Sequence, residues 1–184
     1  MHFLPFKYAA VKRAMIAVGS VCLSLTSGCA QYGGAAQPPS EAEACSSLRS
    51  IIAASDRQFR EYKTTPTINP LSGMTKWETR PVFPNAQCDV LEWAGGRTNY
   101  VCTWPQGNEA QARETYRKHS ALIGRCLDRT WARSDTSGQT GGATVFTKPG
   151  KSTQVVMRYF RPRRGFGTAW ETSLTIGDEV TSDP

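Results

Sequence analysis

Apolar residues recur at helical spacing early in the chain, and this stripe predicts a first helix. The tetrapeptide Ser40-Glu41-Ala42-Glu43 fits a capping box, with Ser40 as the N-cap and Glu43 reaching back to it. We expect a helix from about 41 to 62, ending ahead of Pro66 because a proline biases its predecessor away from helix. The apolar stripe consists of Cys45, Leu48, Ile51, Ile52, Phe59 and Tyr62.

Two strand-like runs, 88–93 and 99–104, flank a Gly-Gly turn and predict a hairpin. If residues 94–96 form a three-residue loop with the last glycine left-handed, Cys88 faces Cys102 across the hairpin. A two-residue Gly-Gly loop would shift the pairing by one residue, so both registers stay open.

A second helix is expected from an Asn108 cap to about Leu127. Its apolar stripe consists of Ala112, Tyr116, His119, Ile123 and Cys126. Three short strands follow, at 143–147, 152–161 and 168–176. Pro149 and Gly150 suit a type II turn between the first two.

Two segments give no clear periodic signal. Residues 63–87 contain four prolines, and they either wrap the surface or include a short edge strand near Trp77–Val82. A recognition loop is a further interpretation of this segment. Residues 129–142 are polar apart from Trp131, which predicts a loop.

The order is therefore helix, hairpin, helix and three-stranded meander. It predicts an α+β fold in two layers, with two helices packed on a five-stranded, mainly antiparallel sheet and stapled by disulfides. We assign 40–176 to a single α+β domain and 177–184 to a short acidic tail. The sequence shows no internal repeat.

The N-terminal segment has the parts of an export signal. Lys7, Lys12 and Arg13 carry its positive charge, and an uncharged run of twelve residues follows at 14–25. A membrane-spanning helix needs about 20 apolar residues, so this run is too short for a permanent anchor.

The tetrapeptide Thr26-Ser27-Gly28-Cys29 resembles the lipobox of bacterial lipoproteins. In that family the cysteine is diacylated and becomes the first residue of the mature protein. Leu is usual three positions before the cysteine, whereas this chain has Thr26 there and Leu25 one further back. The resemblance covers about 30 residues and implies nothing about the folded domain.

On this resemblance, 1–28 is a lipoprotein signal peptide, and 29–39 is the lipidated cysteine with a flexible tether. An Asp after the cysteine retains family members at the inner membrane; Ala30 stands there, which implies the outer membrane of a Gram-negative host. The rival interpretation is ordinary cleavage after Ala30 or Ala36, giving an unlipidated secreted protein.

Removing 1–28 changes the cysteine count and the charge. Four cysteines then remain besides Cys29, which in an exported protein predicts two disulfides. The three-residue hairpin loop pairs Cys88 with Cys102, leaving Cys45 with Cys126 at helix ends that antiparallel packing would bring together. Metal binding is the alternative, but no CxxC motif occurs.

The net charge falls from +7 to +4 when residues 1–28 are removed, because three of the 22 basic residues leave while all 15 acids stay. A net charge of +4 is too small to predict nucleic-acid binding.

The sequence offers little for catalysis. His119 is the only histidine after residue 28, and its place on an apolar stripe favours a structural role. Asp89 and Glu92 would lie on opposite faces of one strand, and no nucleophile elbow or phosphate loop occurs. We therefore predict a protein that is not an enzyme and that uses no cofactor or metal.

Two features favour binding instead. A basic, aromatic turn could hold an anionic partner, since arginine forks pair with carboxylate or phosphate; a solvated sheet edge is the alternative. Its residues are Arg158, Arg161, Arg163, Arg164 and Phe166. Five tryptophans could stack on sugars or pack in the core. We expect a lipoprotein of the outer membrane, with a domain facing the periplasm or, alternatively, the cell surface. This domain would bind a protein or an anionic envelope partner, in an accessory, inhibitor or immunity-type role. The alternative is a cell-wall or outer-membrane enzyme with unidentified carboxylates.

Overall fold

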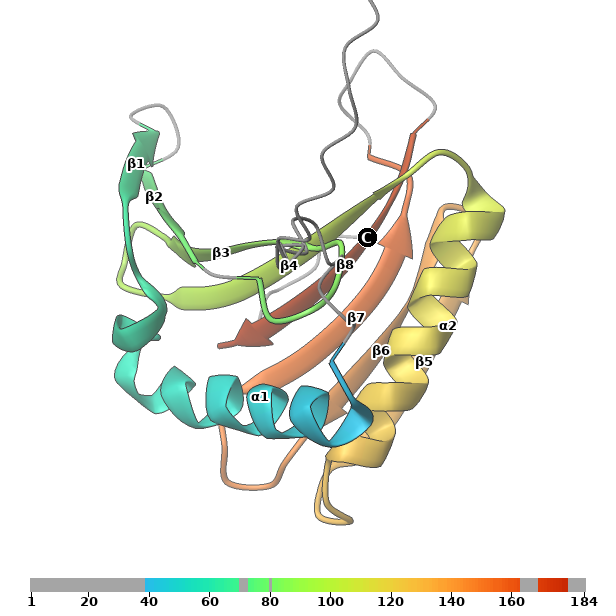
Figure 1. Cartoon of the computed structure of the whole chain (residues 1–184), viewed down its shortest axis with the longest axis horizontal. Helices are drawn as coiled ribbons and strands as arrows, with labels where there is room; N and C mark the ends of the chain where they lie inside the picture. Colours follow the sequence, from blue (N-terminus) through green and yellow to red (C-terminus); the bar gives the residue numbers. More distant parts are fainter. Residues whose placement is uncertain (1–38, 70–72, 80, 163–168, 179–184) are drawn as a thin grey trace, which may run out of the picture. The chain divides into compact units, whose positions relative to one another are not determined.

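The computed structural model describes residues 39–69, 73–79, 81–162 and 169–178 of the chain (Figure 1). All of them lie within one compact region, Gln37–Pro184. Cys29 and the expected signal peptide lie outside the described residues. The elements, in chain order, are α1 (Glu41–Ala54), β1 (Pro66–Asn69), β2 (Met74–Glu78), β3 (Gln87–Glu92), β4 (Thr98–Gln106), α2 (Glu109–Cys126), β5 (Ala132–Gly138), β6 (Gly141–Thr147), β7 (Gln154–Phe160) and β8 (Trp170–Gly177).

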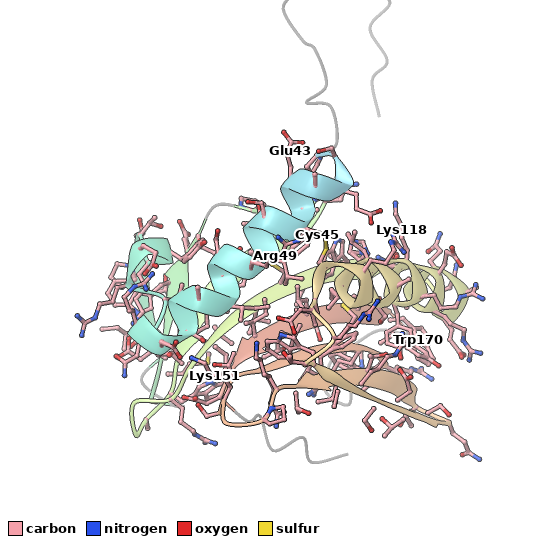
Figure 2. All side chains as sticks on the ribbon, turned by 90° about the horizontal axis from the view of Figure 1, so that it is seen from below. Glu43, Cys45, Arg49, Lys118, Lys151 and Trp170 are labelled. Atoms are coloured by element: carbon pink, nitrogen blue, oxygen red, sulfur yellow. A yellow bond between two sulfur atoms is a disulfide. The ribbon has the colours of Figure 1, made fainter. Side chains whose placement is uncertain are left out.

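The strands form one antiparallel sheet in the order β1-β2-β3-β4-β8-β7-β6-β5. Both helices cover the same face of this sheet (Figure 1, Figure 2). The α+β class with two helices on an antiparallel sheet is therefore confirmed. The expected count of five strands is wrong, because the described residues form eight.

The additional strands lie in the two segments without periodic signal. Residues 63–87 contain the β1–β2 hairpin, in which Pro66 opens an edge strand and Trp77 packs against the core. Residues 129–142 contain β5, which is exposed at every position. Its backbone pairs with β6 from Ala132 to Gly138. Main-chain hydrogen bonds hold this edge strand, so its side chains carry no buried alternation that a sequence pattern could reveal.

The first helix is shorter than expected. It ends at Ala54, and Gln58 and Phe59 adopt left-handed conformations with φ of 55° and 54°. This reversal places the Phe59 ring, which is fully buried, 6.2 Å from the Tyr100 ring. Burial of the ring offsets a backbone conformation that non-glycine residues rarely adopt.

The expected caps and the second helix are confirmed. Ser40 and Glu43 form a reciprocal capping box, with Glu43 accepting from the Ser40 N–H at 2.8 Å. The side chain of Asn108 accepts from the Gln111 N–H at 3.0 Å, and α2 runs on to Cys126.

The structure also forms both expected disulfides. The hairpin adopts the three-residue loop, with Gly96 at φ 82° and the Trp93 N–H donating to the Arg97 carbonyl at 2.9 Å. This register sets Cys88 opposite Cys102, and the two are bonded. Cys45 is bonded to Cys126, so the start of α1 meets the end of α2 and the helices diverge from there (Figure 1).

The described chain passes through the same order of elements twice. Each time a helix is followed by a four-stranded antiparallel meander: α1 with β1–β4, then α2 with β5–β8. The two meanders join along β4 and β8, which pair over eight residues from Asn99 to Gln106. We call these the first and second units. The sequence analysis found no repeat, and this one is a repeat of topology.

Candidate binding site

The structure describes two residues of the predicted basic turn. Arg158 lies on β7 between Met157, which belongs to the core, and Tyr159, whose ring contacts Tyr116 of α2, so the side chain of Arg158 points to the opposite face of the sheet. Its Nε atom is buried, and no hydrogen-bond partner lies among the described atoms. Burial lowers the pKa of this guanidinium. Arg161 is exposed just past the strand, whereas Arg163, Arg164 and Phe166 lie outside the described residues.

A larger feature lies where the two helices meet. There, a pocket of about 630 Å³ opens between the C-terminal half of α1, the end of α2 and the turn between β6 and β7. Helix α1 lines it with Arg49, Ile52 and Ala53, and Asp56 follows in the short 3-10 turn Ser55–Arg57. Their spacing of three, four and seven residues places them on one side of this segment. In Figure 2, which shows both helices in front of the sheet, Arg49 lies midway along α1 and Lys151 below its C-terminal half.

Apolar side chains form the floor of this pocket. Ile52, Leu127 and Trp131 are half-buried, and each packs against the hydrophobic core. Leu127 caps α2 with extended backbone, and the Trp131 N–H donates to the Asp128 carbonyl at 3.2 Å. A short turn after α2 therefore brings both apolar side chains to the pocket.

A pair of hydroxyl groups fixes the far side. The Ser55 hydroxyl donates to the Ile52 carbonyl at 2.6 Å, which uses its only hydrogen. The 2.7 Å contact between Ser55 and Thr153 must then have Thr153 as the donor. Thr153 is buried, and this bond holds the end of α1 to the segment that leads into β7.

The rim is charged, and most of its charges are paired. Lys151 contacts Asp56 at 2.7 Å, and Lys148 contacts Asp128 at 3.4 Å. Arg125 makes two hydrogen bonds of 2.9 Å to Glu41, which lies beside the pocket on the first turn of α1. These bonds from Arg125 lower the pKa of the Glu41 carboxyl.

Arg49 is the exception. Its Nε donates to the Cys126 carbonyl at 3.2 Å, while its terminal nitrogens have no partner among the described residues. Two acids and four bases line the pocket, and Glu41 neutralises Arg125 from outside. One positive charge, that of Arg49, therefore remains without a counter-ion in the described part of the chain.

The sequence analysis missed this pocket. Trp131 was the available signal, because it is the one large apolar side chain in an otherwise polar segment. The part of the pocket near α1 could not be recognised from the sequence, because the charged residues Arg49 and Asp56 suggest a solvent-exposed surface. Ile52, which lies between them, was assigned to the apolar stripe of the core. A smaller pocket of about 410 Å³ shares Leu127 and Trp131 and extends to Phe146 on β6.

His119 has a packed environment rather than a pocket. Its ring lies 4.5 Å from the Trp104 ring and 6.2 Å from the Phe83 ring, and Nδ1 is 3.1 Å from the Thr115 carbonyl. Burial, with a smaller contribution from Lys118, lowers the pKa of His119 to about 4. The ring is therefore neutral at pH 7, and Nδ1 carries the hydrogen donated to Thr115.

The two candidate carboxylates, predicted to lie on opposite faces of one strand, each pair with a different lysine. Asp89 contacts Lys76 at 3.0 Å, whereas Glu92 accepts from Lys63 at 2.8 Å and from the Trp77 indole at 3.1 Å. The bond from Lys63 lowers the pKa of Glu92. The two acids thus contact different lysines, and neither contact brings them together at one reacting atom.

The tryptophans mainly pack. Trp104 is buried and donates to the Pro84 carbonyl at 3.0 Å, and Trp77 and Trp131 pack against the core. Trp170 stacks on Tyr159 with ring centroids 6.0 Å apart. Trp93 is the most exposed, at 37%.

Among the described residues, no cluster of three or more His, Cys, Asp or Glu side chains could hold a metal ion. The same residues include no helix long and apolar enough to cross a membrane. No protein-family model, curated protein or solved structure matches this chain.

Proposed function

We propose that this chain is a bacterial cell-envelope lipoprotein, anchored by lipid on Cys29 at the outer membrane, whose folded domain binds a partner without catalysis. The observation that carries the binding role is the pocket between α1 and α2. Its walls are held by a disulfide and by the Ser55–Thr153 bond, and it presents Arg49, which has no counter-ion in the part of the chain that the structure describes. A concave site that combines apolar surface with placed charged groups is typical of ligand binding.

The envelope location has separate support. The lipobox-like tetrapeptide ends at Cys29, and an oxidising compartment agrees with two disulfides. If Cys29 carries lipid, an even number of cysteines remains for disulfides in the folded domain. The basic turn with Arg161 offers a second surface for an anionic envelope partner.

Location and binding can be tested on the same preparation. We expect the chain to incorporate labelled palmitate and to fractionate with outer membranes, and Cys29→Ser to abolish the label. Label that survives Cys29→Ser would contradict lipid attachment at this residue.

For binding, the intact chain is used to capture molecules from its own envelope fraction, with and without prior reduction of its disulfides. A partner retained by the oxidised chain and lost on reduction is the expected result. A chain that turns over an envelope substrate, or that retains nothing above a blank resin, contradicts the proposal.

A further inference from the structure

The pocket between α1 and α2 has a chemistry that limits what it can hold. Resting on the binding role proposed above, we propose that it binds a small monocarboxylate with an apolar body. The carboxylate would lie on the terminal nitrogens of Arg49, and the apolar body on Ile52, Leu127 and Trp131.

The charge balance argues for a single negative charge. Lys148, Lys151 and Arg125 each already contact a carboxylate, at distances between 2.7 and 3.4 Å. Within the described residues, Arg49 alone among the lining bases has none. A monoanion completes the balance, whereas a phosphate monoester at pH 7 carries close to two charges and would leave one unpaired.

The geometry of Arg49 argues for a carboxylate. Its Nε–H is already donated to the Cys126 carbonyl, which holds the guanidinium at the end of α2. The two terminal nitrogens then present parallel N–H groups, the arrangement that binds both oxygens of a carboxylate end-on. Cys126 is itself held by its disulfide to Cys45 in the preceding turn of α1, so this acceptor is anchored to the helix that carries Arg49.

The floor argues for an apolar body. Ile52, Leu127 and Trp131 offer aliphatic and aromatic surface directly inside the charged rim. The volume of about 630 Å³ lies within the 300–1,000 Å³ typical of small-molecule sites. Both an aromatic acid and a short fatty acid satisfy this chemistry, so the experiment includes one of each.

Titration of the purified full chain with 3-phenylpropanoate and with decanoate tests the proposal. Calorimetry gives the affinity, and nitrogen-edited NMR follows the Arg49 Nε–H and the Trp131 indole N–H. The neutral control is 3-phenylpropanol, which keeps the apolar body of 3-phenylpropanoate and lacks its carboxylate. We expect at least one acid to shift both signals and to bind about tenfold or more tightly than the alcohol, because only the acid makes charge-assisted hydrogen bonds to Arg49.

Three variants sharpen the result. Arg49→Gln should weaken binding of the acid about tenfold or more and leave the affinity for the alcohol unchanged. Arg49→Lys keeps the charge but not the two parallel N–H groups, so its affinity for the acid should lie between those of the native chain and Arg49→Gln. Arg117→Gln is the matched control, since Arg117 is an exposed arginine on α2 outside the pocket lining. Arg49 is itself exposed, so its replacement should leave the melting temperature within about 2 °C.

Three results would each overturn this inference: equal affinity for acid and alcohol, native affinity of the Arg49→Gln variant for the acid, or no shift of either signal at millimolar acid. Failure here is separable from failure of the proposed function. A chain that takes palmitate and retains an envelope partner, unaffected by Arg49→Gln, binds that partner elsewhere.

Discussion

The two disulfides join very different pieces of chain. Cys88 and Cys102 are 14 residues apart, face each other on β3 and β4, and already belong to one hydrogen-bonded hairpin. Cys45 and Cys126 are 81 residues apart and join the helix of the first unit to the helix of the second. The first bond repeats a contact that the backbone ladder makes, whereas the second ties together two units.

The candidate site depends on the second bond only. Cys126 lines the pocket, and its carbonyl accepts from Arg49. The ion pair between Glu41 and Arg125 crosses the same junction between the helices. Stability and the geometry of the pocket are therefore linked at this end of the molecule, whereas the hairpin disulfide lies outside the pocket lining.

The largest effect should follow from replacing Cys45 and Cys126 together by alanine. A disulfide stabilises mainly by restricting the unfolded chain, and closing a loop of 81 residues corresponds to about 4.5 kcal/mol. Denaturant unfolding of the full chain measures the loss. The Arg49 Nε–H signal should also move, since its acceptor is no longer held. A loss smaller than that of the hairpin pair would contradict the comparison.

Replacing Cys88 and Cys102 by alanine should cost less, about 3 kcal/mol for a loop of 14 residues. The β3–β4 ladder persists in this variant, so the Arg49 and Trp131 signals should keep their native positions. Displacement of those signals would show that the hairpin also shapes the pocket, and the contrast between the two disulfides would fail.

Sequence reasoning succeeded where a side-chain pattern and a buried face coincide. The caps at Ser40 and Asn108 and the Gly96 loop have local chemistry that fixes their geometry, and the loop in turn set the cysteine pairing. It failed at β5, since a strand held by its backbone at a sheet edge leaves no apolar alternation.

The pocket could not be predicted from the sequence either, for a different reason. Its lining comes from three segments, represented by Arg49, Trp131 and Lys151, whose proximity is a consequence of tertiary packing. The left-handed Phe59 is similar, because burial against Tyr100 overrides the helical periodicity that continued past Ala54.

A third prediction concerns a second contact between the units, where His119 of α2 packs on Trp104 of β4. Its pKa of about 4 lies below the unfolded value of 6.5, so the unfolded chain binds the proton first as pH falls. The stabilisation is present above pH 6.5 and is lost as pH falls towards 4. The loss amounts to about 2 kcal/mol at pH 5.

His119→Gln should flatten this dependence between pH 7.5 and 5, as measured by denaturant unfolding at each pH. The disulfide does not titrate, and the lowered pKa of Glu41 at the same junction puts its titration below this pH range, so the double variant of Cys45 and Cys126 should keep the native slope. An equal slope in His119→Gln would assign the acid sensitivity to carboxylates instead.

The smallest effect compares the two helix N-caps. Asn108→Ala removes the bond to the Gln111 N–H at the end of α2 far from its disulfide, and should cost about 1 kcal/mol. Ser40→Ala should cost less, because Cys45 holds α1 only five residues further on, which limits fraying. In the double variant of Cys45 and Cys126 this protection disappears, and Ser40→Ala should become as costly as Asn108→Ala. A double-mutant cycle measures that coupling, and strict additivity would show that the disulfide does not reach the start of α1.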